Sequence, residues 1–392
     1  MIFKESGLRD VNSKERVKAA LQLKIPDRVP YGEFAIDYDT VERILGHETY
    51  LRAKAKSQIA FWEGRRDEVV QSWKEDFVEL YKKLDCVDIV NIGCMASGLV
   101  PPRNYKPDPP KRIDENTWID SRGRVYKFSE ITQDITVVED PAKWTEEISI
   151  EDYPEDAVFE RPDESIFEVV DYVIEKLGDE KYILGTSGEE VGMVLLGGMD
   201  RGLMEYMLHP EVVKAASKYF VKRANFNDEY YIREGTDGVL WGQDFSYKNG
   251  PMISPEMYRE FVLPVHKERV AHVKSYGLNV LKHACGNNWL ILDMFVEAGF
   301  DCYQSIQPTA GMDIKEVKEK YGDKICLWGG VAVEHLVSGT REDVINDVRY
   351  AIKYAAVNGG FIMGSSHSIA VGCKYDNYMT MLDEFERLRY CY

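Results

Sequence analysis

Short hydrophobic runs recur along this chain, and in its second half they alternate with segments whose apolar residues recur at helical spacing. Each run is four to seven residues long, which is the length expected of a buried strand. Runs of this kind separated by helices are typical of parallel strands joined by crossover connections. The predicted strands cover residues 28–34, 87–91, 181–186, 238–242, 279–283, 301–304, 324–329 and 360–364.

Helices are predicted between these strands, because capping residues stand at the expected starts. Pro210 can open a helix, since the N–H that proline lacks has no partner in the first turn. Ser254 precedes Pro255, and Thr340 precedes an acidic first turn, as N-cap residues do. Eight strand–helix units predict an α/β fold of the (β/α)8 TIM barrel type. An open doubly wound sheet is the alternative, but no Gly-x-Gly-x-x-Gly follows the first predicted strand.

The rest of the sequence extends this barrel at two places. We expect a single domain over residues 1–392, with an N-terminal helical arm at 1–25 and an insertion at about 96–150. The insertion contains several prolines and an alternating pattern at residues 117–125, which together predict an ordered β-ribbon.

Charge and composition limit the classes of partner that this protein can bind. The formal net charge is −18, and neither nucleic acid nor an anionic membrane surface attracts such a protein. No run of about 18 apolar residues is present, and the first residues lack the apolar core of a signal peptide. Seven cysteines without framework spacing are typical of a reducing compartment. We therefore expect a cytoplasmic protein that acts on a small molecule and binds neither nucleic acid nor membrane.

The predicted strand at 279–283 ends in a histidine, and a cysteine follows two residues later. Alternate residues of an extended chain face the same side, so His283 and Cys285 can reach one point. An imidazole with a thiolate suits Zn²⁺ and suits Mg²⁺ or Ca²⁺ poorly. For so short a motif, two packed side chains without a ligand are the alternative.

Other polar residues also follow predicted strands. In a barrel the C-terminal ends of all strands meet at the end that carries the chemistry, so these residues are expected to converge. Asp244 is the candidate for a fourth metal ligand or a general acid, and a turn-capping role is its alternative. The residues that follow strands are Glu189, Glu190, Gln243, Asp244, Gln307 and the run 365–368.

Four segments carry a family resemblance: residues 25–30 (Ile-Pro-Asp-Arg-Val-Pro), 250–256 (Gly-Pro-Met-Ile-Ser-Pro-Glu), 283–287 (His-Ala-Cys-Gly-Asn) and 364–369 (Gly-Ser-Ser-His-Ser-Ile). In order and spacing they resemble the uroporphyrinogen decarboxylase superfamily, specifically its cobalamin-linked methyltransferase branch, over roughly residues 14–390. The resemblance implies a (β/α)8 barrel with its site at the strand C-termini. Residues 31–38 are acidic and lack the arginine of the true decarboxylases, which disfavours a polycarboxylate substrate.

The resemblance also implies a metal site. In this branch a His-x-Cys at this strand end binds zinc, which implies His283 and Cys285 as ligands, and the last strand supplies a third ligand. The matching position here is His367, where cysteine is usual, and Cys373 is the alternative. Two imidazoles and one thiolate make a more Lewis-acidic zinc, which favours activation of an oxygen over a thiol.

The expected function is therefore that of a zinc-dependent O-demethylase component. It would move a methyl group from a small methoxylated compound, an aromatic O-methyl compound by preference, to the cobalt of a corrinoid (cobalamin). The sequence contains no Asp-x-His-x-x-Gly corrinoid motif, so a separate corrinoid protein is the expected partner.

Other functions remain open at this stage. They are a uroporphyrinogen decarboxylase-like lyase with Asp244 as proton donor, a corrinoid:thiol methyltransferase, and a zinc-holding accessory protein. The methyl donor, the direction of transfer and the oligomeric state, with a homodimer as one option, are not determined by the sequence.

Overall fold

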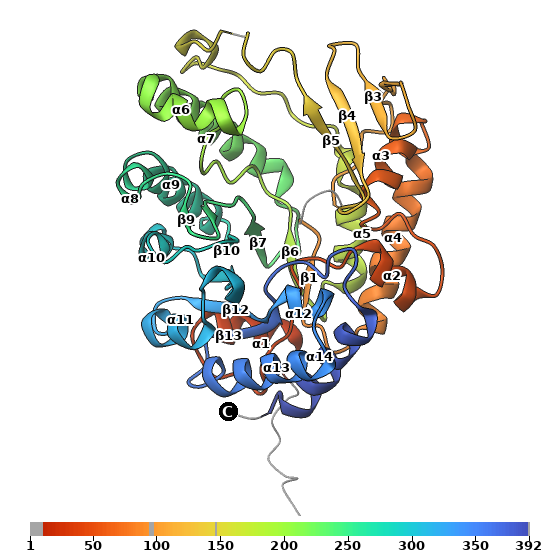
Figure 1. The fold of residues 1–392 in the computed structure, drawn as a ribbon, viewed down its shortest axis with the longest axis vertical. Helices are drawn as coiled ribbons and strands as arrows, with labels where there is room; N and C mark the ends of the chain where they lie inside the picture. The colour runs from red at the N-terminus through yellow and green to blue at the C-terminus, as the bar shows by residue number, and fades with distance from the viewer. Residues whose placement is uncertain (1–10, 94–97, 146, 391–392) are drawn as a thin grey trace, which may run out of the picture.

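The computed structural model of the protein describes residues 11–93, 98–145 and 147–390, so residues 1–10 of the predicted arm lie outside it. At its centre lies a curled parallel sheet in the order β1-β6-β7-β10-β11-β12-β13 (Figure 1). Seven of the predicted strands are confirmed to within two residues at each end. In the described chain they are β1 (Ile89–Asn91), β6 (Tyr182–Gly185), β7 (Gly238–Trp241), β10 (Asn279–His283), β11 (Cys302–Ser305), β12 (Cys326–Val331) and β13 (Phe361–Ser365).

The strand predicted at residues 28–34 is wrong in its extent, because only a single parallel bridge forms there, between Tyr31 and Met363 of β13. On the other side, the Tyr31 carbonyl accepts a hydrogen bond from the N–H of Asp88, just before β1, at 2.8 Å. Pro30 has no N–H to donate to a ladder, which limits the length of a strand at this position. Tyr31 thus connects the two ends of the curled sheet. The fold is TIM-like, with a single bridge in place of the eighth strand.

The inner and outer faces of the sheet are both apolar, because successive strand residues point to opposite sides and both sides are covered. Leu240 and Leu281 belong to the interior cluster, which Val17 of α1 (Ser13–Leu21) joins. Lys14 of the same helix pairs with Asp237, just before β7, at 2.7 Å. Helix α1 therefore covers the N-terminal end of the barrel and leaves the C-terminal end for the loops.

Helices cover the outside of the sheet, and three of them begin at the capping residues found in the sequence. Pro210 is the first residue of α7, Ser254 accepts a hydrogen bond from Met257 N–H, and Thr340 forms a capping box with Asp343. The other helices are α2 (Tyr38–Leu45), α3 (Lys54–Trp62), α4 (Arg66–Lys83), α5 (Glu168–Leu177), α6 (Met199–Leu208), α7 (Pro210–Tyr231), α8 (Pro255–Met257), α9 (Leu263–Lys274), α10 (Leu292–Ala298), α11 (Ile314–Tyr321), α12 (Val333–Val337), α13 (Arg341–Ala355) and α14 (Tyr375–Leu388).

The insertion forms an antiparallel sheet beside α3, as the alternating pattern predicted (Figure 1). Its predicted hairpin is β3 (Thr117–Ile119) with β4 (Val125–Ser129), and β2 (Lys111–Arg112) and β5 (Asp134–Glu139) extend it on both sides. Trp118 packs against Trp62 of α3 with ring centroids 5.8 Å apart. This aromatic contact attaches the insertion to the helical layer.

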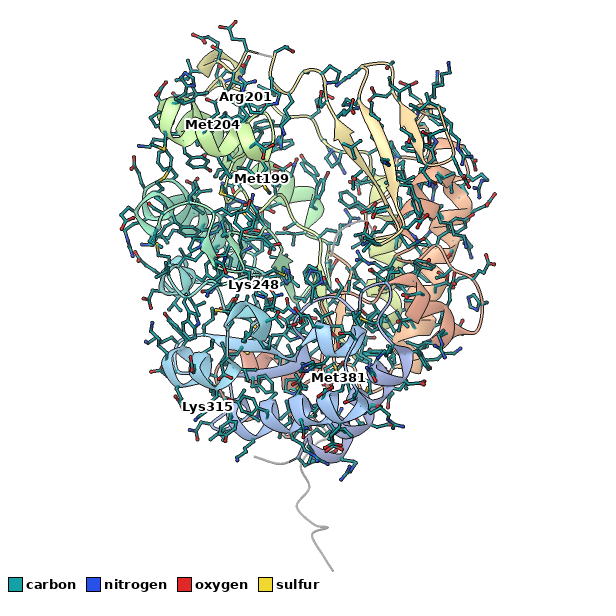
Figure 2. The ribbon with its side chains drawn as sticks, in the orientation of Figure 1. Met199, Arg201, Met204, Lys248, Lys315 and Met381 are labelled. Carbon is teal, nitrogen blue, oxygen red and sulfur yellow. The ribbon has the colours of Figure 1, made fainter. Side chains whose placement is uncertain are left out.

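The segments that follow β6 and β7 meet at the C-terminal end of the barrel. A short hairpin, β8 (Ser246–Tyr247) with β9 (Gly250–Pro251), follows β7, and its Tyr247 hydroxyl lies 3.5 Å from the sulfur of Met199 on α6. Figure 2 labels Met199 by this helix and Lys248 on the hairpin turn. In the part of the chain that the structure describes, no helix is both long and apolar enough to cross a membrane.

Candidate metal centre

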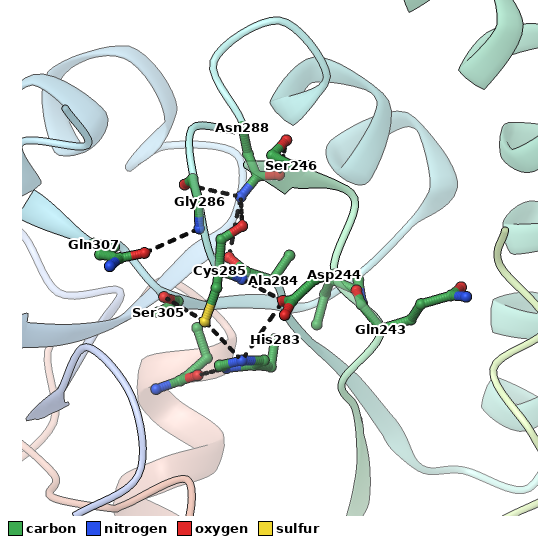
Figure 3. A network of polar contacts seen from close by, with 12 residues as sticks. Gln243, Asp244, Ser246, His283, Ala284, Cys285, Gly286, Asn288, Ser305 and Gln307 are labelled. Atoms are coloured by element: carbon green, nitrogen blue, oxygen red, sulfur yellow. Dashed lines mark hydrogen bonds and ion pairs between the residues drawn. The ribbon is translucent and has the colours of Figure 1, made fainter. Parts of the chain in front are cut away.

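Two strand ends bring three ligand-type side chains together. His283 is the last residue of β10, in the inward-facing register of Leu281, and Cys285 follows after one residue. His367 lies two residues beyond the end of β13. One ligand atom from each of these side chains lies within 4.8 Å of the others. Figure 3 shows the first two, with His283 Nε2 at 3.3 Å from Cys285 Sγ.

This donor set fits zinc in number, chemistry and spacing. Zn–N bonds of about 2.0–2.1 Å and Zn–S bonds of about 2.3 Å place tetrahedral ligands about 3.3–3.8 Å apart. The His283–Cys285 separation of 3.3 Å meets this, and His367, within 4.8 Å, needs only a small side-chain shift. Three protein ligands leave a fourth position for substrate, as in catalytic zinc sites. Cys373, the alternative third ligand, is not part of the group that the described residues form.

The surroundings of His283 keep its imidazole neutral and orient its Nε2 toward the other two grouped side chains. Its Nδ1 forms a hydrogen bond with Oε1 of Gln304, the residue opposite it on β11, which leaves Nε2 free for a metal. The ring of Phe34 stacks on the imidazole with centroids 4.0 Å apart. Burial lowers the pKa of His283 to about 3, and burial also lowers the pKa of His367.

Neighbouring loops fix the backbone around Cys285. Gly286 has φ of +82°, and a Cβ there would lie 2.4 Å from the carbonyl oxygen of Ser246, so glycine is required. Asp244 Oδ1 accepts a hydrogen bond from Cys285 N–H at 2.7 Å, and Gln307 Oε1 accepts one from Gly286 N–H at 3.1 Å (Figure 3). Burial, followed by the nearby Asp244 carboxylate, raises the pKa of the Cys285 thiol to about 12. Ionisation of this thiol at neutral pH therefore requires a bound cation.

Asp244 lies at the open side of the site. Its side chain is 43% exposed, and its Oδ1 is 3.9 Å from His283 Nε2. The carboxylate is not one of the three grouped ligands, but it stands next to two of them. This position suits an acid that acts on a substrate atom, and the hydrogen bond to Cys285 N–H gives it a positioning role as well.

These protonation states predict how zinc binding depends on pH. The imidazoles are already neutral at pH 7–9, so only the Cys285 thiol loses a proton when zinc binds. The apparent zinc affinity should therefore rise about tenfold per pH unit in this range, with about one proton released per zinc. Calorimetry in buffers of different ionisation enthalpy measures the released protons. Release of no proton, or of two, would contradict the assigned ligand set.

Lys282, the residue before His283 on β10, points to the outer face of the sheet instead. It is fully buried, and its Nζ lies 2.8 Å from Oε1 of Glu190 and donates to the carbonyl of Gln243 at 2.7 Å. His266 Nε2 lies 3.1 Å from the same Glu190 oxygen. Burial raises the pKa of Glu190, but Lys282 and His266 outweigh it and hold that pKa at about 2. The pair connects β10 to the loop after β6 directly behind the metal centre.

Removing one member of this pair should destabilise the protein strongly. In Lys282→Ala the buried Glu190 carboxylate loses its main counter-charge, and such a change costs about 3–5 kcal/mol of unfolding free energy. Urea unfolding followed by circular dichroism measures this loss. The double variant Lys282→Met with Glu190→Leu should recover most of it, because no buried charge is left unpaired. A single variant that loses less than about 1 kcal/mol would exclude this role.

A cavity of about 550 Å³ opens beside the candidate site, within the range of small-molecule pockets. Phe34, which stacks on His283, forms part of its wall together with Trp241 and Leu240. Glu189 and Glu190 also line it, and none of its described lining residues is a lysine or arginine. The cavity therefore favours a neutral, partly apolar compound over an anion.

Other residues that follow the strands support the candidate site through hydrogen bonds and ion pairs. Gln307 and Asp244 hold the Cys285 loop, whereas Gln243 and Glu190 belong to the Lys282 network. Sequence reasoning missed Gln304, which lies inside a predicted strand and not after it. Only its register opposite His283 reveals its function, and register is not visible in a single strand.

Comparisons with known proteins identify the family and the fold of the chain. The family described as "Uroporphyrinogen decarboxylase (URO-D)" matches residues 131–388, more than half of the chain. A methylated-thiol–coenzyme M methyltransferase from Methanosarcina mazei is 29% identical over 127 residues, which are 32% of this chain and 32% of that protein. The chain thus aligns with about a third of this relative's length. A solved structure described as a methyltransferase from Methanosarcina mazei covers 97% of this chain and 99% of its own, with a TM-score of 0.65 at 16% identity, and shows the same fold.

Proposed function

Since the chain belongs to the uroporphyrinogen decarboxylase (URO-D) family, we propose that it is a zinc-dependent methyltransferase of that family. It exchanges a methyl group between a small methylated sulfur compound and the cobalt of a corrinoid on a separate protein. The observation that carries the proposal is the convergence of His283, Cys285 and His367 at the C-terminal end of the barrel.

Sulfur is favoured as the methyl-bearing atom by the comparison with a relative that acts on a methylated thiol. A methylated sulfur compound is therefore the first candidate substrate, in place of the methoxylated compound that the sequence favoured. A methoxylated compound remains the second candidate, because two neutral imidazoles beside one thiolate suit an oxygen ligand as well. The uncharged wall of Phe34, Trp241 and Leu240 accommodates a neutral body in either case.

In this mechanism each residue has a defined task. His283, Cys285 and His367 would hold the metal, which when bound would supply Lewis-acid polarisation of the methyl-bearing atom. Gln304 keeps His283 turned so that its Nε2 faces Cys285 Sγ, where the metal would lie. Asp244, half exposed at the mouth, delivers a proton to the departing heteroatom or removes it in the reverse direction. Phe34 covers one face of His283 and keeps water from the ligand.

The test combines metal analysis with a methyl-transfer assay. Zinc should be present at about one equivalent, as expected for a three-ligand site. The protein is then incubated with cob(I)alamin and with either methyl thioethers or methoxylated phenols, and methylcobalamin formation is followed by its absorbance. We expect transfer from the thioethers, and faster transfer from methoxylated phenols would establish the second candidate.

Two outcomes would reject the proposal. A protein that binds no zinc but decarboxylates a small acid would be a lyase of this family, with Asp244 as the proton donor. A protein that binds zinc tightly but transfers no methyl group in either direction would be an accessory protein.

A further inference from the structure

Glu33 is a buried carboxyl group without a counter-charge. It is 1% exposed, follows the Tyr31 bridge, and lies where the eighth barrel position ends. Within the described chain, no lysine, arginine or histidine nitrogen forms an ion pair with it. Its hydrogen-bond partners are the Tyr31 hydroxyl and the hydroxyl and N–H of Ser365, the last two at 2.5 and 3.2 Å. Burial raises the pKa of Glu33 to about 7, and it outweighs the hydrogen bonds that Ser365 and Tyr31 can donate to the ionised form.

The side chain of Ser365 lies between two oxygen atoms that both need a hydrogen-bond partner. The Ser365 hydroxyl contacts two oxygens, the carboxyl Oε2 of Glu33 and the backbone carbonyl of His367. A hydroxyl carries one proton, and a carbonyl can only accept, so the serine must donate to His367. The remaining contact is a hydrogen bond only if Glu33 donates to the serine oxygen. A protonated Glu33 therefore satisfies both contacts of the Ser365 hydroxyl with one hydrogen bond each.

Ser365 is also connected to the second imidazole. Its carbonyl accepts a hydrogen bond from Gln304 Nε2 at 3.2 Å, and Gln304 Oε1 holds His283 Nδ1. The side chain of Ser365 thus fixes the backbone of His367, while its main chain fixes the amide that orients His283. The hydrogen bonds that position His367 and His283 therefore both start at Ser365. The position of Ser365 in turn depends on Glu33.

We propose that Glu33 is a protonated acid that positions both imidazole ligands, His367 through the Ser365 hydroxyl and His283 through Ser365 and Gln304. It is a positioning residue, because none of its contacts reaches the substrate side of the centre. The inference rests on the metal centre of the proposed function and assigns the residue that sets its metal affinity.

The test measures zinc affinity at pH 7 by competition with a chelator, together with the visible spectrum of the Co²⁺-substituted protein. Glu33→Ala should weaken zinc binding about 10–100-fold, the usual effect of removing a group that orients a ligand. Ser365→Ala should weaken it in the same direction and alter the Co²⁺ bands. Glu33→Gln should lose clearly less zinc affinity than Glu33→Ala, because its amide N–H₂ can donate to the Ser365 hydroxyl as the acid does, although it cannot accept the 3.2 Å hydrogen bond from Ser365 N–H.

A control separates positioning from general stability. Asp76→Ala on α4 removes another buried carboxyl that accepts two hydroxyl hydrogen bonds, from Thr49 and Ser72, both at 2.5 Å. It should lower the melting temperature without changing zinc affinity or the Co²⁺ spectrum. If Glu33→Gln is as defective as Glu33→Ala, the group acts as a carboxylate and the inference is wrong.

The two proposals fail in different ways. Unchanged zinc affinity in both Glu33→Ala and Ser365→Ala, with zinc bound to the wild type, would overturn the role of Glu33 and leave the methyltransferase proposal standing. A wild-type protein that binds no zinc would overturn the metal centre and this inference together.

Discussion

Cys285→Ala should lose zinc and methyl transfer together while the barrel stays folded. Cys285 supplies the thiolate of the donor set, and two neutral imidazoles alone bind zinc weakly at neutral pH. Loss of the several kcal/mol that a polarising metal contributes corresponds to at least about 10³-fold in turnover. Elemental analysis measures the metal, and the cob(I)alamin assay measures the transfer.

The matched control is Cys373→Ala. Cys373 is a free cysteine as well, buried at 7% exposure, but it lies outside the grouped ligands, so this variant should keep its zinc and its activity. Circular dichroism should show folded protein for both variants, since Cys285 lies at the mouth and not in the apolar core. If Cys285→Ala retains zinc and Cys373→Ala loses it, Cys373 and not Cys285 supplies the thiolate. If Cys285→Ala keeps both zinc and activity, the zinc mechanism is wrong.

Asp244→Asn should reduce turnover about 10²-fold and leave zinc bound. Asparagine keeps an oxygen that can accept the hydrogen bond from Cys285 N–H, so the Cys285 loop should remain in place. It cannot carry a proton to the substrate heteroatom, so only the acid–base contribution is lost. Steady-state kinetics should show a lower kcat at unchanged zinc content.

Two further variants define the role of Asp244. Asp244→Ala removes the hydrogen bond as well as the acid, so it should lose zinc affinity in addition to turnover. Asp293→Asn on α10 makes the same chemical change at an exposed position and should leave both quantities unchanged. Wild-type turnover in Asp244→Asn, combined with loss of zinc in Asp244→Ala, would leave Asp244 only the role of holding the loop.

Local patterns were sufficient for much of the fold. Strand length, helical periodicity and capping residues such as Thr340 depend on nearby residues only, and seven strands and the insertion hairpin are confirmed on that basis. Where a local signal was mixed, the prediction was less accurate. Residues 28–34 are hydrophobic enough for a strand, but Pro30 and the packing at Tyr31 leave only a bridge.

The candidate site was likewise predictable from local patterns only in part. His283 and Cys285 are two residues apart on an extended segment, so their common direction follows from strand geometry alone. His367 is different, because β11 and β12 separate β13 from β10 in the sheet. Strands are about 4.8 Å apart, so a flat sheet would hold these two strand ends about 14 Å apart. Only the curl of the sheet brings the ligand atoms within 4.8 Å.

The supporting residues depend on tertiary structure most of all. Gln304 meets His283 because of the register between β10 and β11, and Glu33 meets Ser365 because the two ends of the sheet close on each other. Lys282, one residue from His283, faces away from the site because alternate strand residues point to opposite faces. The sequence by itself determined seven strands, the helix starts and the common direction of two candidate ligands, His283 and Cys285, because their geometry is local. The place of the third candidate ligand was decided by closure of the sheet, which joins residues hundreds of positions apart. The hydrogen bond that orients His283 was decided by the register between β10 and β11.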